Sequence, residues 1–184
     1  MERYLHASRE KAGRLKDLTD QMFRYFLVYA APEMEADPQP YDGVILMEQL
    51  LAEPVIRLTE EGFSVNMEGL SWPCWVRADV PYLQRALDNV FSNVQKHADR
   101  RQPVTVSAAL AAGWLIIQVE NGVPHQPNPA ESTRIGLRTC RKILQAMGGT
   151  FTTRQEQDRF MAELTLPVIP APEGMEDGSA KAGM

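Results

Sequence analysis

The order of helical and strand patterns between residues 79 and 166 constrains the fold of this chain more than any other feature. A helical pattern begins after Asp79, a residue type that often caps helices. Its apolar side chains recur every three or four residues and therefore form one face. That predicted inward face consists of Val80, Leu83, Leu87, Val90, Phe91 and Val94. Two alternating strand patterns follow, 104–110 and 114–119, on either side of Gly113.

The rest of this region adds a loop, a helix and a hairpin. Residues 120–133, rich in Pro and Asn, predict the one long loop. The pattern over 135–147 predicts a helix that ends at Gly148, and 150–154 with 160–166 predict a hairpin. Helices and strands in this order favour a mixed sheet covered by helices on one face. We therefore expect a two-layer α/β sandwich, α+β in class, whose other face is uncovered.

Further elements precede Asp79. Residues 43–61 predict a helix that ends at Gly62, and short strand patterns cover 63–67 and 72–76. The face of that helix expected to be buried consists of Val44, Met47, Leu51, Val55 and Leu58.

The N-terminal segment predicts a helix that requires a partner helix. Its apolar residues alternate at spacings of three and four, as in a heptad seam. The seam consists of Leu15, Leu18, Met22, Tyr25 and Tyr29. Residues 32–40 contain three prolines and three acids, a composition typical of an extended linker. We therefore divide the chain into a helix (1–31), a linker (32–41), a globular domain (42–168) and a tail (169–184). An alternative is that the seam docks on the same globular domain.

Charge and apolar content exclude several classes of protein. Nineteen Lys and Arg against 24 Asp and Glu give a net charge of −5, so we expect no nucleic-acid partner. The longest apolar stretch, 104–119, is interrupted by two hydroxyl residues and a glycine, so no transmembrane helix is expected. The N-terminus lacks a secretory signal pattern. Cys74 and Cys140 have no CxxC partner, which favours reduced, cytosolic core residues over a disulfide or a zinc site.

A polar stripe lies on the helix that follows Asp79. It consists of Arg85, Asn89, Asn93 and Lys96, with His97 beside it. Asparagine is unfavourable inside a helix, so two in register suggest a use. A carboxamide oxygen suits Mg²⁺, and Lys96 suits a phosphate. The alternative is an ordinary solvated helix face.

Three segments resemble, in the same order, the motifs of sensor histidine kinases. Residues 88–98 (DNVFSNVQKHA) are similar to the N-box of that family, and 135–149 (IGLRTCRKILQAMGG) to its second glycine box and following helix. Residues 11–26 are similar to the second helix of the dimerisation and phosphotransfer hairpin, which identifies segment 1–31. The resemblance implies the Bergerat fold of gyrase-type ATPases, ATP and Mg²⁺ as ligands, and phosphotransfer to histidine.

The resemblance also assigns roles to residues. It implies that Asn93 binds Mg²⁺, that Asn89 and Lys96 face the phosphates, and that His97 lies beside the nucleotide. The second glycine box implies a phosphate contact at Gly136 and Leu137, where a helix N-terminus favours an anion. Asn93 and Lys96 are the expected catalytic residues.

The sequence departs from the family at several sites. No Asp occupies the first glycine box, and Asn121 is the positional substitute that could accept a hydrogen bond from adenine. The resemblance implies that Gly122 supplies the turn at the nucleotide, and the alternative is that Asn121 and Gly122 form an ordinary turn after a strand. Pro124 and His125 stand where the motif requires a flexible backbone, so the edge of the pocket is expected to be stiffer or differently shaped. Arg134 replaces the first glycine of the second box and is retained as a nucleotide-binding candidate.

The phosphoacceptor motif is missing, because no histidine of the chain is followed by an acid and then a proline. We therefore expect a cytoplasmic fragment of a longer, membrane-anchored or soluble kinase that phosphorylates a histidine on a helix outside the chain, for relay to a response regulator. Kinase activity of the fragment alone is doubtful. The seam predicts a weak homodimer. The alternative function is a degenerate, non-catalytic module that acts in signalling through dimerisation or partner binding.

Overall fold

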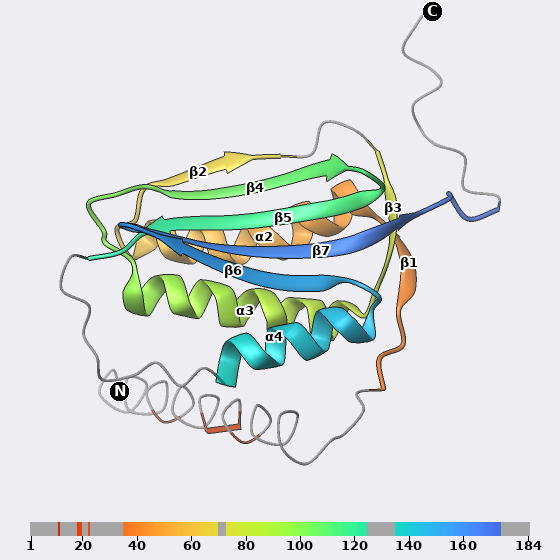
Figure 1. Ribbon diagram of the computed structural model, residues 1–184, viewed down its shortest axis with the longest axis horizontal. Coiled ribbons are helices and arrows are strands. Elements are labelled where there is room, and N and C mark those ends of the chain that lie inside the picture. Colours follow the sequence, from red (N-terminus) through yellow and green to blue (C-terminus); the bar gives the residue numbers. More distant parts are fainter. Residues whose placement is uncertain are drawn as a thin grey trace, which may run out of the picture.

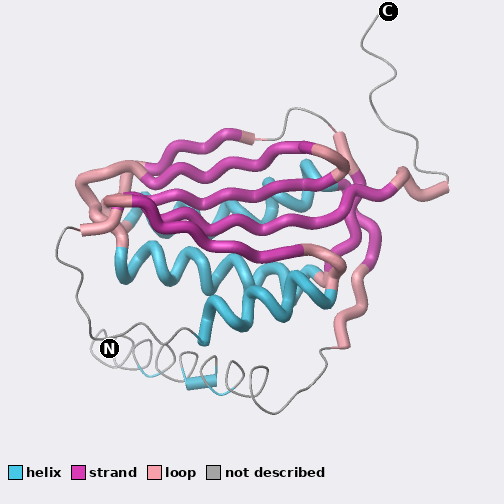
Figure 2. The backbone as a smooth tube through the Cα atoms, in the orientation of Figure 1, coloured by secondary structure: helices cyan, strands magenta, loops and turns pink. Residues whose placement is uncertain are grey.

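The structure is a computed structural model, and it describes residues 11, 18, 19, 22, 35–69, 73–124 and 135–173. Strands and helices form separate layers, as Figures 1 and 2 show. The elements in chain order are β1 (Gln39–Asp42), α2 (Gly43–Glu60), β2 (Val65–Glu68), β3 (Trp75–Ala78), α3 (Val80–His97), β4 (Val104–Ala111), β5 (Trp114–Gly122), α4 (Ile135–Ala146), β6 (Thr150–Glu156) and β7 (Arg159–Ile169).

One sheet contains all seven strands of the described chain. Its order is β1-β3-β7-β5-β4-β2, and β6 pairs with β7 outside this path. The β2–β4 pair is parallel, whereas the other pairs are antiparallel, so the sheet is mixed. Helices α2, α3 and α4 lie on the same side of it (Figure 1). The predicted two-layer α/β sandwich is confirmed.

The core lies between the sheet and these helices. In β5, Leu115, Ile117 and Val119 are buried, and each is paired with a buried residue of β7. The opposing side chains of α3 are largely those predicted: all are buried except Val80, which is half-buried. Alternation along the strands and helical periodicity along α3 therefore meet in one apolar layer, the main source of folding free energy.

Both long helices begin at an aspartate. The carboxylate of Asp42 accepts hydrogen bonds from the backbone N–H groups of Val44 (2.8 Å) and Ile45 (3.1 Å). Asp79 accepts from the N–H of Tyr82 at 3.2 Å, which confirms its predicted capping role. These bonds satisfy donors that the first helical turn leaves without an intrahelical acceptor.

The buried face of α2 is rotated from the prediction. Met47, Leu51 and Leu58 are buried as expected, whereas Val44 and Val55 are only half-buried. Leu46, Leu50 and Pro54 complete the inner face instead. The helix contacts both α3 and the sheet, so its apolar stripe is wider than a single heptad seam. Gly62 has φ +88°, a left-handed conformation that explains why the helix ends there.

Strand β1 was not predicted, and it overlaps the expected linker 32–41. Gln39 and Pro40 pair with Ala78 and Arg77 of β3. Proline cannot donate a ladder hydrogen bond, but β1 lies at the sheet edge, where this is tolerated. Ile169, predicted as the first residue of the tail, is the last residue of β7.

The bounds of other strands also differ from the prediction, among them those of β5, β2 and β3. β5 continues through Gly122, because Glu120, Asn121 and Gly122 pair with β7, so the long loop does not begin at residue 120. β2 covers 65–68 rather than 63–67, and β3 covers 75–78 rather than 72–76. Residue 72 lies outside the described residues.

Part of the N-terminal seam lies within the described residues. Leu18 and Met22 are helical, with 57% and 74% of their surface exposed. Leu15, Tyr25 and Tyr29 lie outside the described residues, as do His125, Arg134 and most of the tail. Within the described part of the chain, no helix combines the length and apolar character needed to cross a membrane.

Candidate functional site

The central contact of the candidate site joins the middle of α3 to the first turn of α4. Asn89 is 7% exposed. A Cβ atom added to Gly136 would lie 3.5 Å from the Asn89 Oδ1 atom and 3.8 Å from its Cγ atom, so the Asn89 side chain lies beside Gly136 with room for little more than a methyl group between them. The backbone N–H groups of the first α4 turn therefore lie beside the polar stripe of α3. Such a helix start favours an anion.

The stripe becomes more exposed toward the C-terminal end of α3. Asn93, one turn after Asn89, is half-buried, Lys96 is exposed and His97 is half-buried. The spacing of four, seven and eight residues places all three near the face of Asn89. The stripe thus runs from a buried carboxamide to an exposed ammonium group.

Asn121 lies at the end of β5 and is only 3% exposed. It has the strand parity of Val119 and Ile117, so its side chain faces the helical layer. Its Nδ2 atom donates to the backbone oxygen of Gly122 at 2.8 Å. In this orientation the Oδ1 atom remains as an acceptor for another group.

Glu120, the neighbouring acid, is oriented to the opposite face. Its Oε1 atom accepts a hydrogen bond from Arg159 Nη1 at 2.7 Å. It therefore does not replace the aspartate that the family motif leads one to expect, and the alternation of the strand selects Asn121 instead.

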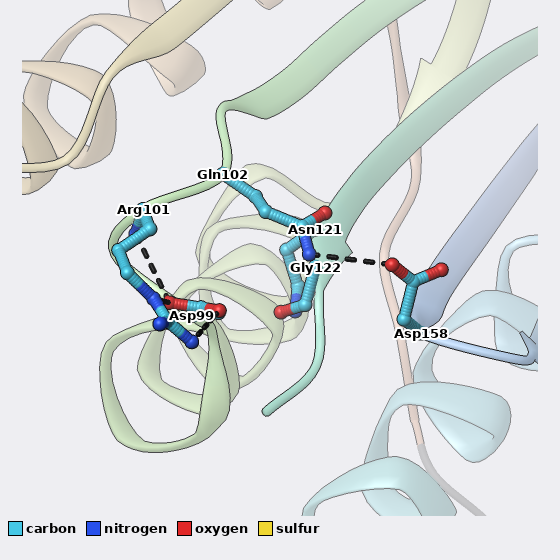
Figure 3. A network of polar contacts seen from close by, with 6 residues as sticks. All are labelled: Asp99, Arg101, Gln102, Asn121, Gly122 and Asp158. Atoms are coloured by element: carbon cyan, nitrogen blue, oxygen red, sulfur yellow. Dashed lines mark hydrogen bonds and ion pairs between the residues drawn. The ribbon is translucent and has the colours of Figure 1, made fainter. Parts of the chain in front are cut away.

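Gly122 is enclosed rather than placed in an open turn (Figure 3). A Cβ atom here would lie 2.5 Å from Gln102 Cδ and Oε1 and 2.8 Å from Gln102 Cβ. Its φ is not positive, so lack of space, not backbone conformation, explains the glycine. The interpretation of Asn121 and Gly122 as an ordinary turn is wrong, because both belong to β5.

Two turns hold this end of β5. The N–H of Asp99 donates to the Gly122 oxygen at 2.9 Å, and the N–H of Val123 donates to the Asp158 oxygen at 2.6 Å. The Gln102 side chain reaches across Gly122 to Asp158, with 3.4 Å between Nε2 and Oδ2 (Figure 3). Asp99, Gln102 and Asp158 could not be predicted from the sequence, since turn residues so far apart in the chain give no periodic signal.

Arg101, in the turn after α3, and Cys74, before β3, have shifted pKa values. Hydrogen bonds to the Asp99 carboxylate raise the pKa of the Arg101 guanidinium, which stays charged in any case. Burial, reinforced by the negative charge of Asp42, raises the pKa of the Cys74 thiol. Cys74 and Cys140 are both buried and reduced, as predicted. The raised pKa keeps the Cys74 thiol protonated near neutral pH.

Of the two remaining predicted site residues, the structure describes Leu137 but not Arg134. Leu137 is half-buried in the first turn of α4 and packs against the core. Arg134 lies outside the described residues. Across 35–69, 73–124 and 135–173, no group of three or more His, Cys, Asp or Glu side chains could hold a metal ion. Any metal there would need ligands of another kind, such as carboxamide and phosphate oxygens.

Comparison with known proteins gives one family match. The model of the family "Histidine kinase-, DNA gyrase B-, and HSP90-like ATPase" matches residues 78–170, which include α3, β5 and α4.

Curated relatives are sensor kinases. Sensor histidine kinase YrkQ of Bacillus subtilis (strain 168) is 27% identical over 159 residues, covering 86% of this chain and 36% of YrkQ. Aerobic respiration control sensor protein ArcB of Escherichia coli (strain K12) is 28% identical over 149 residues, covering 69% of this chain and 19% of ArcB. The chain thus spans about a third or less of their length.

Solved structures show the same fold. Full-length ShkA in complex with AMPPNP matches with a TM-score of 0.70 and 23% identity, covering 91% of this chain and 39% of that one. The Acinetobacter baumannii histidine kinase AdeS matches with a TM-score of 0.65 and 13% identity, covering 89% and 83%.

Proposed function

Because the chain belongs to the family of histidine kinase-, DNA gyrase B- and HSP90-like ATPases, we propose that it is the ATP-binding kinase module of a two-component sensor histidine kinase. In this proposal it transfers the γ-phosphate of ATP to a histidine outside the chain. The observation that carries the proposal is that the Asn89 side chain on α3 lies beside Gly136 on α4, which brings the two motifs together in one place.

The phosphates are bound where the helix start and the polar stripe meet. The N–H groups at Gly136 and Leu137 favour an anion through their own partial charges and the helix dipole. Asn89 can donate or accept hydrogen bonds at the buried end, and the exposed Lys96 supplies a positive charge at the other end. Arg134 is proposed as a further nucleotide contact from its place in the motif.

Asn93 is the proposed Mg²⁺ ligand. Its carboxamide oxygen is a hard, neutral donor in the middle of the stripe, and Mg²⁺ commonly uses few protein ligands together with substrate phosphates. When bound, the ion would neutralise charge on the phosphates. The residues of the stripe fit this group, because a half-buried carboxamide lies one helical turn from the buried Asn89.

The base is read at the end of β5. Asn121 offers its Oδ1 atom as an acceptor for an exocyclic amino group, since its Nδ2 atom is already bonded to Gly122. Half-buried His97 flanks the nucleotide in this proposal, and the absent side chain of Gly122 leaves room for Gln102. Binding of both ends positions the γ-phosphate, and transfer then depends on alignment and charge rather than on covalent chemistry by the protein.

The partners follow from the same proposal. Residues 1–31 form the second helix of a phosphotransfer hairpin that dimerises weakly and is joined by a linker to the ATP-binding domain. The acceptor histidine lies on the other hairpin helix, and a response regulator receives the phosphate in the cytoplasm. The structure of histidine kinase ThkA in complex with response regulator protein TrrA, a fold neighbour with a TM-score of 0.64, supports such a partner.

The second candidate is a module that has lost productive ATP binding. The neutral Asn121 in place of a carboxylate favours it, because a neutral acceptor binds an amino group more weakly than a charged one. Calorimetric titration with ATP in the presence of Mg²⁺ separates the two proposals. Saturable binding below millimolar concentration supports the kinase module, and no binding at millimolar ATP refutes it.

A further inference from the structure

Gln102 lies in the turn between α3 and β4, outside the motifs that carry the proposed nucleotide site. We propose that Gln102 is a positioning residue that fixes the orientation of the Asn121 carboxamide and thereby sets the preference for a 6-amino purine. This inference rests on the proposed function, because it concerns the same base-reading position.

The carbonyl group of Gly122 holds the Asn121 carboxamide in one orientation. It accepts one hydrogen bond from Asn121 Nδ2 at 2.8 Å and another from the Asp99 N–H at 2.9 Å. The direction of this carbonyl therefore decides which end of the carboxamide faces the helical layer. With Nδ2 bonded, Asn121 presents an acceptor. If the Gly122 peptide rotated, the carboxamide could reverse and present a donor.

Gln102 in turn holds the Gly122 peptide in place. The Gln102 side chain occupies the space where a Gly122 side chain would lie, with three of its atoms within 2.8 Å of an ideal Cβ position. The backbone N–H of Gln102 also donates to the Asp99 oxygen at 3.0 Å, so the turn that supplies the Asp99 donor is closed by the same residue. Rotation of the Gly122 peptide would have to displace both the Gln102 side chain and the turn from Asp99 to Gln102.

The Gln102 side chain is itself held by the turn that contains Asp158. Its Nε2 atom lies 3.4 Å from Asp158 Oδ2, and the Asp158 carbonyl accepts the Val123 N–H at 2.6 Å. Figure 3 shows the side chain spanning Gly122 between these two turns. The end of β5 is thus enclosed by two turns. The packing of Gln102 over Gly122 contributes more to holding this peptide than the long Gln102–Asp158 hydrogen bond does.

The consequence is a specificity effect. Adenine carries an amino group where guanine carries a keto oxygen, so an acceptor-presenting Asn121 favours adenine and a reversible carboxamide favours neither. Removing Gln102 should lower this preference without affecting the phosphate contacts on α3 and α4. Those contacts lie on other elements and share no hydrogen bond with Gln102 among those described.

The test compares calorimetric binding of ATP, GTP and inorganic tripolyphosphate to wild type and Gln102→Ala. We expect ATP affinity to fall about fivefold, the effect of one neutral hydrogen bond, with the ATP-to-GTP ratio reduced similarly and tripolyphosphate binding unchanged. Gln118→Ala is the matched control, since Gln118 is a part-buried glutamine on β5 bonded to Glu163 at 2.8 Å, and it should match wild type. Equal losses for tripolyphosphate, or unchanged ATP binding, would overturn the inference.

A conservative variant and a spectroscopic measurement complete the test. Gln102→Met fills the same space, so it should retain the ATP preference, and a loss as large as that of Gln102→Ala would overturn the packing argument. In ¹H–¹⁵N spectra, the Asn121 side-chain amide signal should shift in Gln102→Ala and not in Gln118→Ala. An unchanged signal refutes the positioning role even if wild type binds no ATP, whereas absent ATP binding with a shifted signal refutes only the proposed function.

Discussion

Replacement of Asn93 by alanine tests the centre of the proposed site. If its carboxamide oxygen binds Mg²⁺, Asn93→Ala should remove the Mg²⁺-dependent part of ATP affinity and leave the fold intact. The measurement is a pair of calorimetric titrations with ATP, one in Mg²⁺ and one in EDTA, together with a thermal unfolding curve. The difference between the two titrations isolates the metal contribution.

The expected magnitudes follow from the position of Asn93 on α3. The residue is half-buried, and alanine is the better helix former by up to about 0.7 kcal/mol. The free energy of unfolding should therefore change by less than about 1 kcal/mol. Loss of a ligand to a charged group costs about 1.5–3 kcal/mol, so the Kd for ATP in Mg²⁺ should rise about 10- to 100-fold. The Kd in EDTA should stay the same.

Two further variants on the same helix make the result specific. Gln95→Ala removes a carboxamide that donates to Glu61 Oε1 at 2.9 Å on the exposed surface, and it should bind ATP like wild type. Asn89→Ala removes a buried carboxamide and should lower the free energy of unfolding by about 1–3 kcal/mol. A strong loss of thermal stability in Asn93→Ala, or undiminished Mg²⁺ dependence, would show that Asn93 is structural.

Three other predictions address the base-reading position and the N-terminal helix. Asn121→Asp should tighten ATP binding, because a carboxylate is the stronger acceptor, and should lower the free energy of unfolding by about 1–3 kcal/mol, because it loses the donor to Gly122; unchanged or weaker affinity would mean that another residue reads the base. Gly122→Ala should destabilise the fold by about 1–3 kcal/mol through overlap with Gln102, and combining it with Gln102→Ala should recover part of that loss in denaturant unfolding; an equally unstable double variant would contradict the packing. The exposed Leu18 and Met22 should support a weak dimer that sedimentation detects at high concentration and that Leu18→Glu with Met22→Glu abolishes; a strictly monomeric wild type would refute the seam.

Local sequence patterns identified most of the elements that carry the site. The helix from Asp79 to His97 was predicted with its cap and its inner face, because helical periodicity records which side is buried. The polar residues Asn89 and Asn93 stood out on it for the same reason. Asn121 was identified only from the family motif, because the predicted strand ended at residue 119. The structure showed that β5 continues through it and turns its side chain to the inner face, opposite to Glu120.

Tertiary structure alone decided the features that depend on distant partners. Strand β1 forms because Gln39 and Pro40 pair with residues of β3 some 38 positions later in the chain. Its own sequence did not predict a strand, because proline is unfavourable in strands except at a sheet edge. The enclosure of Gly122 joins Gln102 to Asp158 across a separation of 56 residues. Periodicity reports only whether a side chain is buried, and not which residue buries it. The sequence therefore determined the inner faces of α3 and of residues 114–119 in β5. The contacts that position Asn121 arose only when the α3–β4 turn and the β6–β7 turn met at the same end of the sheet.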